Sequence, residues 1–321
     1  MFQGLLEICL SHVNECSLLA MSLSRIVKQP IRRFLIDNFP QLIISHEWPG
    51  FVGRRIDWSN PVDLNEKIQW LICFSDTSEW TRLSDKYLVR EYVESKGLEE
   101  ILPELYGVWS DADEIDLDAL PDRFVLKCNH DSGSVFIIDK SQTNDFNSIR
   151  HEINRRLKRR FGYDCCEPHY NKIRPKVIAE EFLESSDPGV RFSSSLIDYK
   201  VWCFNGEPYS FLVCYGRGEG KVFVNAYDLD WIVHPEYSVF DNHHLDGHGK
   251  VNKPKTFDRM MECARLLSSG FPEVRVDFYE VDGKLYFGEM TFTSLAGRMT
   301  YYTENYLKRM GDQIILPHRK K

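Results

Sequence analysis

The sequence has no apolar run long enough to cross a membrane. A membrane-spanning helix needs about 20 consecutive apolar residues, and the most apolar segment, residues 1–23, is interrupted by polar and charged side chains. That segment also lacks the basic start and uninterrupted apolar centre of a signal peptide. It predicts one or two amphipathic helices that pack on the body. Because four basic residues lie between positions 25 and 33, contact with a membrane surface is the alternative.

An excess of positive charge and a regular pattern of cysteines are also lacking. The formal net charge of −8 argues against general nucleic-acid binding. The 9 cysteines are odd in number and show no regular disulfide spacing. A reducing, cytoplasmic compartment is the simpler interpretation. No repeat or low-complexity run interrupts the 321 residues, whose 43% hydrophobic content suits a folded core divided between two or three lobes.

The most informative segment present is VRVDFYEVDGKLYFGEMTFT, which begins at Val274. It predicts two strands joined by a tight turn at Asp282-Gly283. Alternate side chains of a strand share a face, so Asp277 on the first strand and Glu289 on the second can lie near each other. Two carboxylates on one face repel unless a hard cation such as Mg²⁺ binds them. The alternative is an ordinary sheet with a solvated polar face.

A second segment predicts an anion-binding loop. The apolar run that ends in Lys127 is followed by CNHDSGS and then by another apolar run from Val135. Such a strand–loop–strand unit offers backbone N–H groups and serine hydroxyls to an anion beside a lysine charge. It is not a P-loop, because the GxxxxGK[ST] pattern is absent. The alternative is a hairpin turn with a surface lysine.

The sequence also predicts helices, a connector and domain boundaries around these segments. Asp63 and Glu66 predict a capping box, a further helix is expected over residues 84–96, and a connector is expected over 103–118. A basic helix over 151–161 is interpreted as a solvated face or as a docking surface for an anionic sugar polymer, a uronic-acid donor or a lipid headgroup. The expected domains are a helical extension (1–55), an α-rich subdomain (56–120), a first mixed subdomain (121–185) and a second one with the C-terminal tail (186–321).

Three weaker motifs suggest further functional sites or a different activity. The segment GRGEGK, with Arg217 and Lys221, is interpreted as a loop that reaches a phosphate or the acceptor. The histidines of DNHHLDGHG suggest a metal site by composition, although incidental histidines are the preferred interpretation. Asp228-Leu229-Asp230 fits the DxD spacing of a glycosyltransferase, a pattern that is common by chance.

In order along the chain, these motifs resemble the ATP-grasp fold and, more narrowly, the TupA-like ATP-grasp family of bacterial surface-polysaccharide gene clusters. The resemblance covers roughly residues 56 to 300. It rests on NPVDLNEKIQWL, SDKYLVREYV, FVLKCNHDSGS, VIAEEFLE, DYKVWCFNGEP, AYDLDW and GFPEVRVDFYEVDGKLYFGEMTFT. It implies an α+β protein in which two α+β subdomains clamp ATP, with a helical N-terminal extension.

The resemblance also implies residue roles. Lys127 would contact the α- and β-phosphates, Glu180 would lie in the adenine hinge, Asp198 would lie near the ribose, and Arg275 would stabilise the transferring phosphoryl group. The implied ATP-contacting set is Lys86, Lys127, His130, Ser132, Gly133, Ser134, Glu180, Glu181, Asp198 and Lys200. The implied Mg²⁺ ligands are Asp277, Glu289 and Thr291, and the implied catalytic residues are Arg275 and Lys127. Thr291 stands where the family usually has Asn, and Asp131 stands where relatives often have Gly.

The implied activity is that of an ATP-dependent carboxylate–amine ligase that forms an acylphosphate. Its expected partners are a carboxylate-bearing sugar or polysaccharide precursor, such as a uronic acid of a capsule or O-antigen, and an amino acid or amine. A kinase or glycosyltransferase of polysaccharide synthesis, and a non-catalytic ATP-binding protein, are the alternatives. We expect the protein in the cytoplasm, with the inner face of the membrane as the alternative location.

Overall fold

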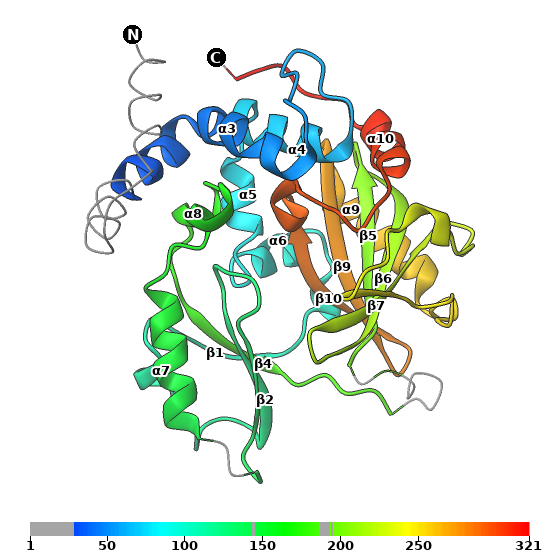
Figure 1. Cartoon of the computed structure of the whole chain (residues 1–321). Coiled ribbons are helices and arrows are strands. Elements are labelled where there is room, and N and C mark those ends of the chain that lie inside the picture. The colour runs from blue at the N-terminus through cyan, green and yellow to red at the C-terminus, as the bar shows by residue number, and fades with distance from the viewer. Residues whose placement is uncertain (1–28, 143–144, 187–192, 194, 321) are drawn as a thin grey trace.

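A computed structural model describes residues 29–142, 145–186, 193 and 195–320 (Figure 1). The amphipathic helices predicted over residues 1–23 lie outside this part of the chain. Among the residues it covers, no helix is both long and apolar enough to cross a membrane.

The secondary structure is mixed, as the sequence predicts. The helices are residues 29–38, α3 (Pro40–Val52), α4 (Leu64–Phe74), α5 (Ser78–Leu83), α6 (Val89–Ser95), η1 (Glu99–Ile101), η2 (Ala112–Glu114), α7 (Phe146–Leu157), α8 (Gly162–Cys165), η3 (Tyr170–Lys172), η5 (Pro235–Tyr237), α9 (Phe257–Ser268), η6 (Ser294–Gly297) and α10 (Glu304–Gln313). The strands are β1 (Leu105–Trp109), β2 (Arg123–Cys128), β3 (Val135–Asp139), β4 (Val177–Glu181), β5 (Asp198–Phe204), β6 (Glu207–Gly218), β7 (Lys221–Tyr227), β8 (His244–Asp246), β9 (Glu273–Val281) and β10 (Lys284–Thr291).

The strands form two separate sheets, one in each lobe of Figure 1. The smaller sheet has the order β1-β4-β2-β3 and is antiparallel throughout. The larger has the order β10-β9-β5-β6-β7-β8, in which only the β7–β8 pair is parallel. Each sheet has its own hydrophobic core, which defines two α+β lobes.

Alternation of side chains along β2 and β4 explains why Lys127 and Glu180 face the cleft between the lobes. Phe124 and Leu126 alternate with Val125 and Lys127 along β2, and the first pair lies in the core that Ile153 of α7 completes. Because alternate side chains point to opposite faces, Lys127 points away from α7. β4 follows the same rule, with Val177 and Ala179 in the α7 core and Ile178 and Glu180 on the other face.

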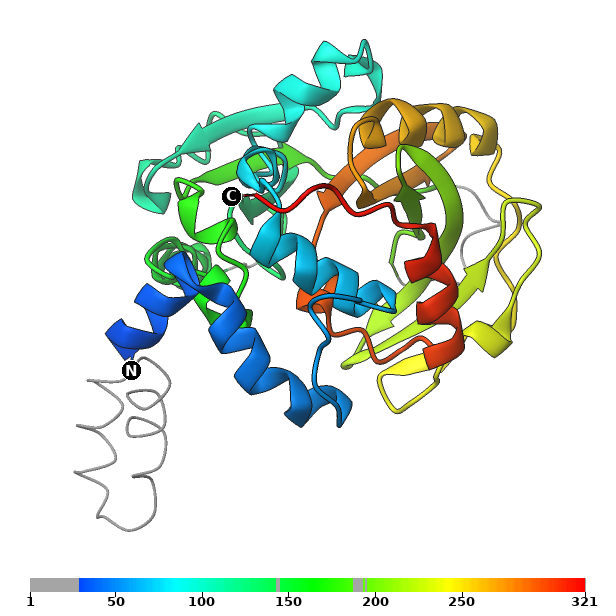
Figure 2. The same ribbon diagram turned by 90° about the horizontal axis from the view of Figure 1, so that it is seen from above.

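On the larger sheet, α9 packs against β5, β6 and β9. α10 packs against α4, and the chain after α10 returns to the end of α4, where the Lys320 N–H donates to the Phe74 carbonyl at 2.7 Å (Figure 2). α4 begins as predicted, since the Asp63 carboxylate accepts from the Glu66 N–H at 2.9 Å. The Glu66 carboxylate accepts from the Val62 N–H at 2.6 Å, so the reciprocal bond is one residue earlier than in a standard capping box.

Three expected elements differ from the structure. The helix expected over 84–96 is α6, which begins at Val89, because the Asp85 carboxylate accepts from the N–H groups of Tyr87 and Leu88 and holds a turn. The connector expected over 103–118 contains β1. The basic helix expected over 151–161 is α7, which spans 146–157 after an Asp145 cap. The domain boundaries stay a prediction.

The contact of α10 with α4 depends on Gly311. A Cβ at this position would lie 2.7 Å from the Asp63 carbonyl carbon and 2.8 Å from the Val62 oxygen. We expect Gly311→Ala to lower the free energy of unfolding by about 1–3 kcal/mol, measured by urea denaturation, because the backbone of the α4 cap must move. Gly218→Ala is the control, since a Cβ there meets nothing within 4 Å. Equal stability of both variants would contradict this packing.

Candidate functional site

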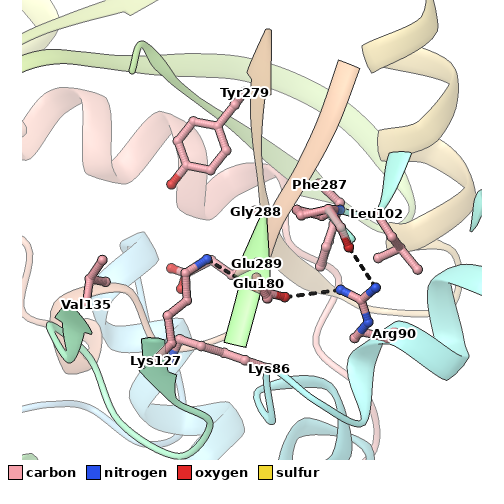
Figure 3. Close-up of a pocket in the computed structure, with 11 residues that line it drawn as sticks. Lys86, Arg90, Leu102, Lys127, Val135, Glu180, Tyr279, Phe287, Gly288 and Glu289 are labelled. Carbon is pink, nitrogen blue, oxygen red and sulfur yellow. Dashed lines mark hydrogen bonds and ion pairs between the residues drawn. The ribbon is translucent and has the colours of Figure 1, made fainter. Parts of the chain in front are cut away.

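Side chains from both lobes line one cleft (Figure 3). Its lining consists of Lys86, Arg90, Leu102, Pro103, Lys127, Val135, Glu180, Tyr279, Phe287, Gly288 and Glu289. The cationic Lys127 of the small sheet and the acidic Glu289 of the large sheet therefore face the same space. The cavity of about 100 Å³ is smaller than the roughly 300–1,000 Å³ of small-molecule sites, so binding a nucleotide requires side chains of the cleft to move.

Glu180 is the centre of the small-lobe wall. Its Oε2 lies 2.8 Å from Lys127 Nζ and its Oε1 lies 3.1 Å from Arg90 Nη1, and Figure 3 shows the two cations reaching it from opposite sides. Arg90 Nη2 also donates to the Pro103 carbonyl at 2.8 Å. The Glu180 side chain is 8% exposed, so two cations balance the desolvation of its charge.

The predicted anion loop joins β2 to β3. Lys86 donates from Nζ to the Asp131 carbonyl, which ties the loop to the turn before α6. Ser132 and Gly133 form its exposed tip, where Gly133 has a φ of 79°. This conformation favours glycine.

The buried part of the loop pairs the charge of Asp131, which stands where relatives often have Gly. Its carboxylate accepts from the Ser134 hydroxyl and lies 3.3 Å from Arg156 Nη1. The charge is thus paired and points away from the tip. His130 is also buried, and its Nε2 lies 3.2 Å from the Arg159 carbonyl, so its ring faces α7. Burial lowers the pKa of His130.

The predicted hairpin brings the acidic residues of the large lobe together. Asp277 and Glu289 are cross-strand partners on β9 and β10. Arg275 lies between them: its Nε and Nη2 donate to the two oxygens of Asp277 at 2.7 Å each, and Nη2 lies 3.3 Å from Glu289 Oε1. The Thr291 hydroxyl donates to Glu289 at 2.9 Å and accepts from Arg275 at 3.1 Å.

A bulge at Gly288 makes this pairing possible. Lys284 pairs with Val281 and Phe287 pairs with Phe278, but Glu289 then pairs with Asp277 because the register shifts by one residue. A Cβ at position 288 would lie 2.9 Å from the Asp277 carbonyl oxygen, so the bulge requires glycine here.

A second set of charges lies next to the hairpin on β5. Lys200 Nζ lies 2.7 Å from Asp198 Oδ2 and also contacts Asp277. Burial acts to lower the pKa of Lys200, but the two carboxylates outweigh it and raise that pKa. Arg217 Nη2 lies 3.1 Å from Asp198 Oδ2, while the buried Oδ1 has no hydrogen-bond partner among the described residues.

The carboxylates suit one hard cation more readily than two. Both oxygens of Asp277 are held by Arg275, and Oδ2 also by Lys200, which keep the pKa of Asp277 low despite burial. The Glu289 side chain is 44% exposed and lines the cleft. Within the described ranges, no three Asp, Glu, His or Cys side chains converge to hold a metal. In many nucleotide sites Mg²⁺ is bound through one or two carboxylates together with substrate phosphates.

Some predicted residues lie apart from the cleft wall. Glu181 faces β1, where its Oε2 accepts from the Glu104 N–H at 3.3 Å. The GRGEGK segment forms the β6–β7 hairpin: Arg217 lies one residue before the end of β6, and Lys221 begins β7. Asp228 closes a turn by accepting from the N–H groups of Asp230 and Ile232, which accounts for the DxD spacing structurally.

Two histidines of the histidine-rich segment lie beside carboxylates. His244 Nδ1 lies 3.4 Å from Asp241 Oδ2, and His248 Nδ1 lies 3.1 Å from Asp246 Oδ2. The two histidines thus pair with different carboxylates. His244 and Asp246 belong to β8.

Two residues with long-range contacts, Arg90 in the cleft lining and Glu167 next to the end of β10, were not found from the sequence. Arg90 gave no local signal, because an arginine on a helix is ordinarily a solvated charge. Glu167 is buried, and its Oε1 accepts from the Thr293 hydroxyl at 2.5 Å. This bond ties the segment after α8 to the chain that leaves β10, two residues beyond Thr291.

Glu167 predicts a pH dependence of stability. Burial raises the pKa of its carboxyl to about 7, so between about pH 4.5 and pH 7 the folded state binds the proton more tightly than the unfolded state. Its contribution to stability is complete below that window and is lost as pH rises through it. We expect Glu167→Gln to have a higher melting temperature than the wild type at pH 8.5, with a free energy of unfolding that is raised by at most about 3 kcal/mol. At pH 4.5 the two proteins should melt at nearly the same temperature.

The control is Glu94→Gln on the exposed side of α6, which should leave the dependence of melting temperature on pH unchanged. If wild type and Glu167→Gln kept a constant difference in melting temperature across this pH range, Glu167 would not be the titrating group.

A cleft between two α+β lobes, with a lysine strand and loop on one side and an Arg–Asp–Glu hairpin on the other, defines the ATP-grasp class. The model of the TupA-like ATPgrasp family matches residues 66–315. The chain belongs to this family. No curated protein matches the sequence.

Solved structures with related folds are ligases of low identity. D-Alanine–D-alanine ligase from Bacillus anthracis in complex with ATP is 13% identical over 79% of this chain and 68% of that one, with a TM-score of 0.43. L-Amino acid ligase from Bacillus licheniformis is 12% identical over 70% and 47%, with a TM-score of 0.41. Phosphoribosylamine–glycine ligase from Thermotoga maritima is 13% identical over 66% and 49%, with a TM-score of 0.38.

Proposed function

We propose that the protein is an ATP-dependent carboxylate–amine ligase that joins an amino acid or amine to a uronic acid of a bacterial surface polysaccharide. Its family supports ATP-grasp chemistry. The observation that carries the proposal is the single cleft in which Lys127 and Glu289, from different sheets, face each other with Arg275 beside Glu289.

The cleft offers matching surfaces for a nucleotide. Leu102, Pro103, Val135 and Phe287 provide apolar contact for a base, and the Glu180 carboxylate can accept from an adenine amino group. Lys127 and Lys86 supply positive charge, and the exposed tip of the anion loop supplies backbone N–H groups for the phosphates. For this to happen, Lys127 must exchange part of its contact with Glu180 for a phosphate oxygen.

Glu289 is the residue proposed to hold Mg²⁺, with Asp277 and Thr291 behind it. When bound, the ion neutralises charge on the phosphate oxygens. Arg275 stays protonated between the two acids, since their charges outweigh the effect of burial and raise its pKa. It is fixed by Asp277 and by Ser294, to which Nη1 donates at 2.5 Å. A cation held this rigidly needs no reorganisation as charge develops.

The proposed reaction has two steps. A substrate carboxylate oxygen bonds to the γ-phosphorus of ATP as the β–γ bridging bond breaks, which gives an acylphosphate and ADP. The amine nitrogen then bonds to the acyl carbon, phosphate leaves, and the amine proton passes to solvent. Within this scheme the protein positions the reactants and stabilises charge.

The test is product identity. Purified protein is incubated with ATP, Mg²⁺, a uronic acid and mixed amino acids, and the products are identified by mass spectrometry. An amide together with ADP and phosphate supports the proposal. A sugar phosphate would identify a kinase, and nucleotide-sugar consumption without ATP a glycosyltransferase. Tight ATP binding without turnover under every acceptor would identify a binding protein. Loss of an amide substituent from the polysaccharide of a deletion strain would identify the substrate.

A further inference from the structure

A second pocket, of about 280 Å³, lies on the other side of the turn that carries Lys86. It is lined by Thr81, Asp85, Tyr87, Leu88, Lys172, Ile173, Arg174 and Lys176. Asp85 and Tyr87 flank Lys86 in sequence, and Lys86 lines the ATP-grasp cleft. Because neighbouring Cα atoms are about 3.8 Å apart, a single backbone turn separates the two pockets.

Three cations line this pocket from one short segment. Lys172 is the last residue of η3, and Arg174 and Lys176 follow in the chain that leads into β4. The buried Ile173 also belongs to the lining. Within the described residues, none of the three lies within ion-pair distance of a carboxylate, in contrast to Arg155 and Arg156 of α7, which both pair with Glu152.

The acid in the pocket lining does not neutralise these cations. Asp85 Oδ1 accepts from the Tyr87 N–H at 2.8 Å, the Leu88 N–H at 3.3 Å and Asn129 Nδ2 at 2.9 Å. Burial also raises the pKa of Asp85. The Tyr87 ring, 4.9 Å from Lys176 Nζ, adds an aromatic surface of the kind that packs against a sugar.

We propose that this pocket binds carboxylates of an anionic sugar chain, so that neighbouring uronate units are held while one unit reacts in the cleft. This rests on the proposed function. The evidence is three cations that have no ion-pair partner among the described residues, next to an aromatic ring and one turn away from the cleft. The overall charge of −8 opposes a nucleic-acid ligand.

The pocket is connected to the anion loop through Asn129. The Asn129 carbonyl accepts from the Lys86 N–H at 3.1 Å, its Nδ2 donates to Asp85 and to the Arg174 carbonyl at 3.0 Å, and its Oδ1 accepts from the Lys176 N–H at 2.7 Å. A sugar chain in the pocket would therefore hold the turn that carries Lys86 and the anion loop in a fixed arrangement. Since coupling between two binding sites is reciprocal, occupancy should lower the dissociation constant for ATP, and ATP should tighten sugar binding.

The experiment measures tetragalacturonate binding by calorimetry at low salt. The double variant Lys172→Gln/Arg174→Gln changes two exposed side chains and should raise the dissociation constant about 5- to 30-fold. The matched control, Lys250→Gln/Lys308→Gln, changes two exposed lysines of the larger lobe and should have no effect. Monogalacturonate should bind more weakly than the tetramer to the wild type, and the double variant should reduce that difference.

The remaining outcomes separate this inference from the proposed function. Equal tetramer affinity of the wild type and the double variant overturns the inference, even when the enzyme forms amides. Loss of tetramer binding in the double variant supports it, even when no amide product is found with any amine. Tripolyphosphate that binds more tightly than the tetramer, and loses affinity in the double variant, would overturn the sugar assignment and identify a phosphorylated ligand.

Discussion

Lys127→Met is expected to reduce ATP-dependent turnover by about 10²- to 10³-fold while the melting temperature stays within a few degrees of the wild type. The ammonium group lies in the cleft wall with its side chain 26% exposed, and methionine retains most of the aliphatic stem. The fold should tolerate the change because Glu180 keeps its contact with Arg90 at 3.1 Å. Charge on the phosphate oxygens would lose a fixed cation, which is the reason for the slower reaction.

Steady-state assays of ADP release measure this effect, with Lys308→Met on the exposed side of α10 as the charge-matched control. The dissociation constant for ATP should also rise, because Lys127 contacts the phosphates before transfer. Undiminished turnover in a folded Lys127→Met protein would remove this residue from the mechanism and would leave Lys86 as the candidate phosphate contact on that side of the cleft.

The parts of the fold that follow local rules could be predicted from the sequence. The apolar run that ends in Lys127 predicts β2. Once the strand is placed, the face on which the lysine lies follows, because side-chain direction in a strand depends only on position. The turn at Asp282-Gly283 predicts the β9–β10 hairpin, and both residues have positive φ values of 52° and 81°, as a tight primed turn requires.

The pairing of Asp277 with Glu289 was predicted correctly, but the sequence argument left out the feature that produces it. A two-residue turn without a bulge would continue the Lys284–Val281 register and pair Asp277 with Gly288, which would put Glu289 on the opposite face. The bulge restores the pairing. An isolated glycine inside a strand pattern is a signal for a bulge, so Gly288 offered this information.

Contacts between distant segments could not be predicted in this way. Arg90 and Glu180 are 90 residues apart, and neither has a periodicity that specifies the other. The Glu167–Thr293 bond spans 126 residues and depends on how the segment after α8 packs against the end of β10. Such pairs follow from the docking of the two lobes, which local propensity does not determine.

The second prediction with a large effect concerns Asp277 and Glu289. These two acids are direct neighbours on the hairpin, but loss of their charge should have different effects on stability. Asp277→Asn is expected to lower the free energy of unfolding by about 3–5 kcal/mol. The Asp277 side chain is 1% exposed, and it is the shared partner of Arg275 and Lys200. Removing its charge would leave two buried cations with fewer partners, and the new amide group would direct N–H donors at one of them.

Glu289→Gln removes the same charge from the neighbouring strand but should leave the free energy of unfolding within about 0.5 kcal/mol of the wild type. Its side chain is 44% exposed and accepts from Arg275 only at 3.3 Å, so water can solvate the change. Turnover should nevertheless fall by about 10²-fold or more, and excess Mg²⁺ should restore part of it, since an amide oxygen is a weaker ligand than a carboxylate.

Urea denaturation and ADP release on the two variants test this division of roles, because each variant serves as the charge-matched control of the other. The expected result is a destabilised Asp277→Asn protein and a stable but slow Glu289→Gln protein. Equal losses of stability would show that Glu289 is a structural partner of Arg275, and the proposed metal site would then have no accessible carboxylate. A stable Asp277→Asn protein would instead show that Lys200 and Arg275 are neutralised by Asp198 and Glu289 alone, which the 3.3 Å contact to Glu289 argues against.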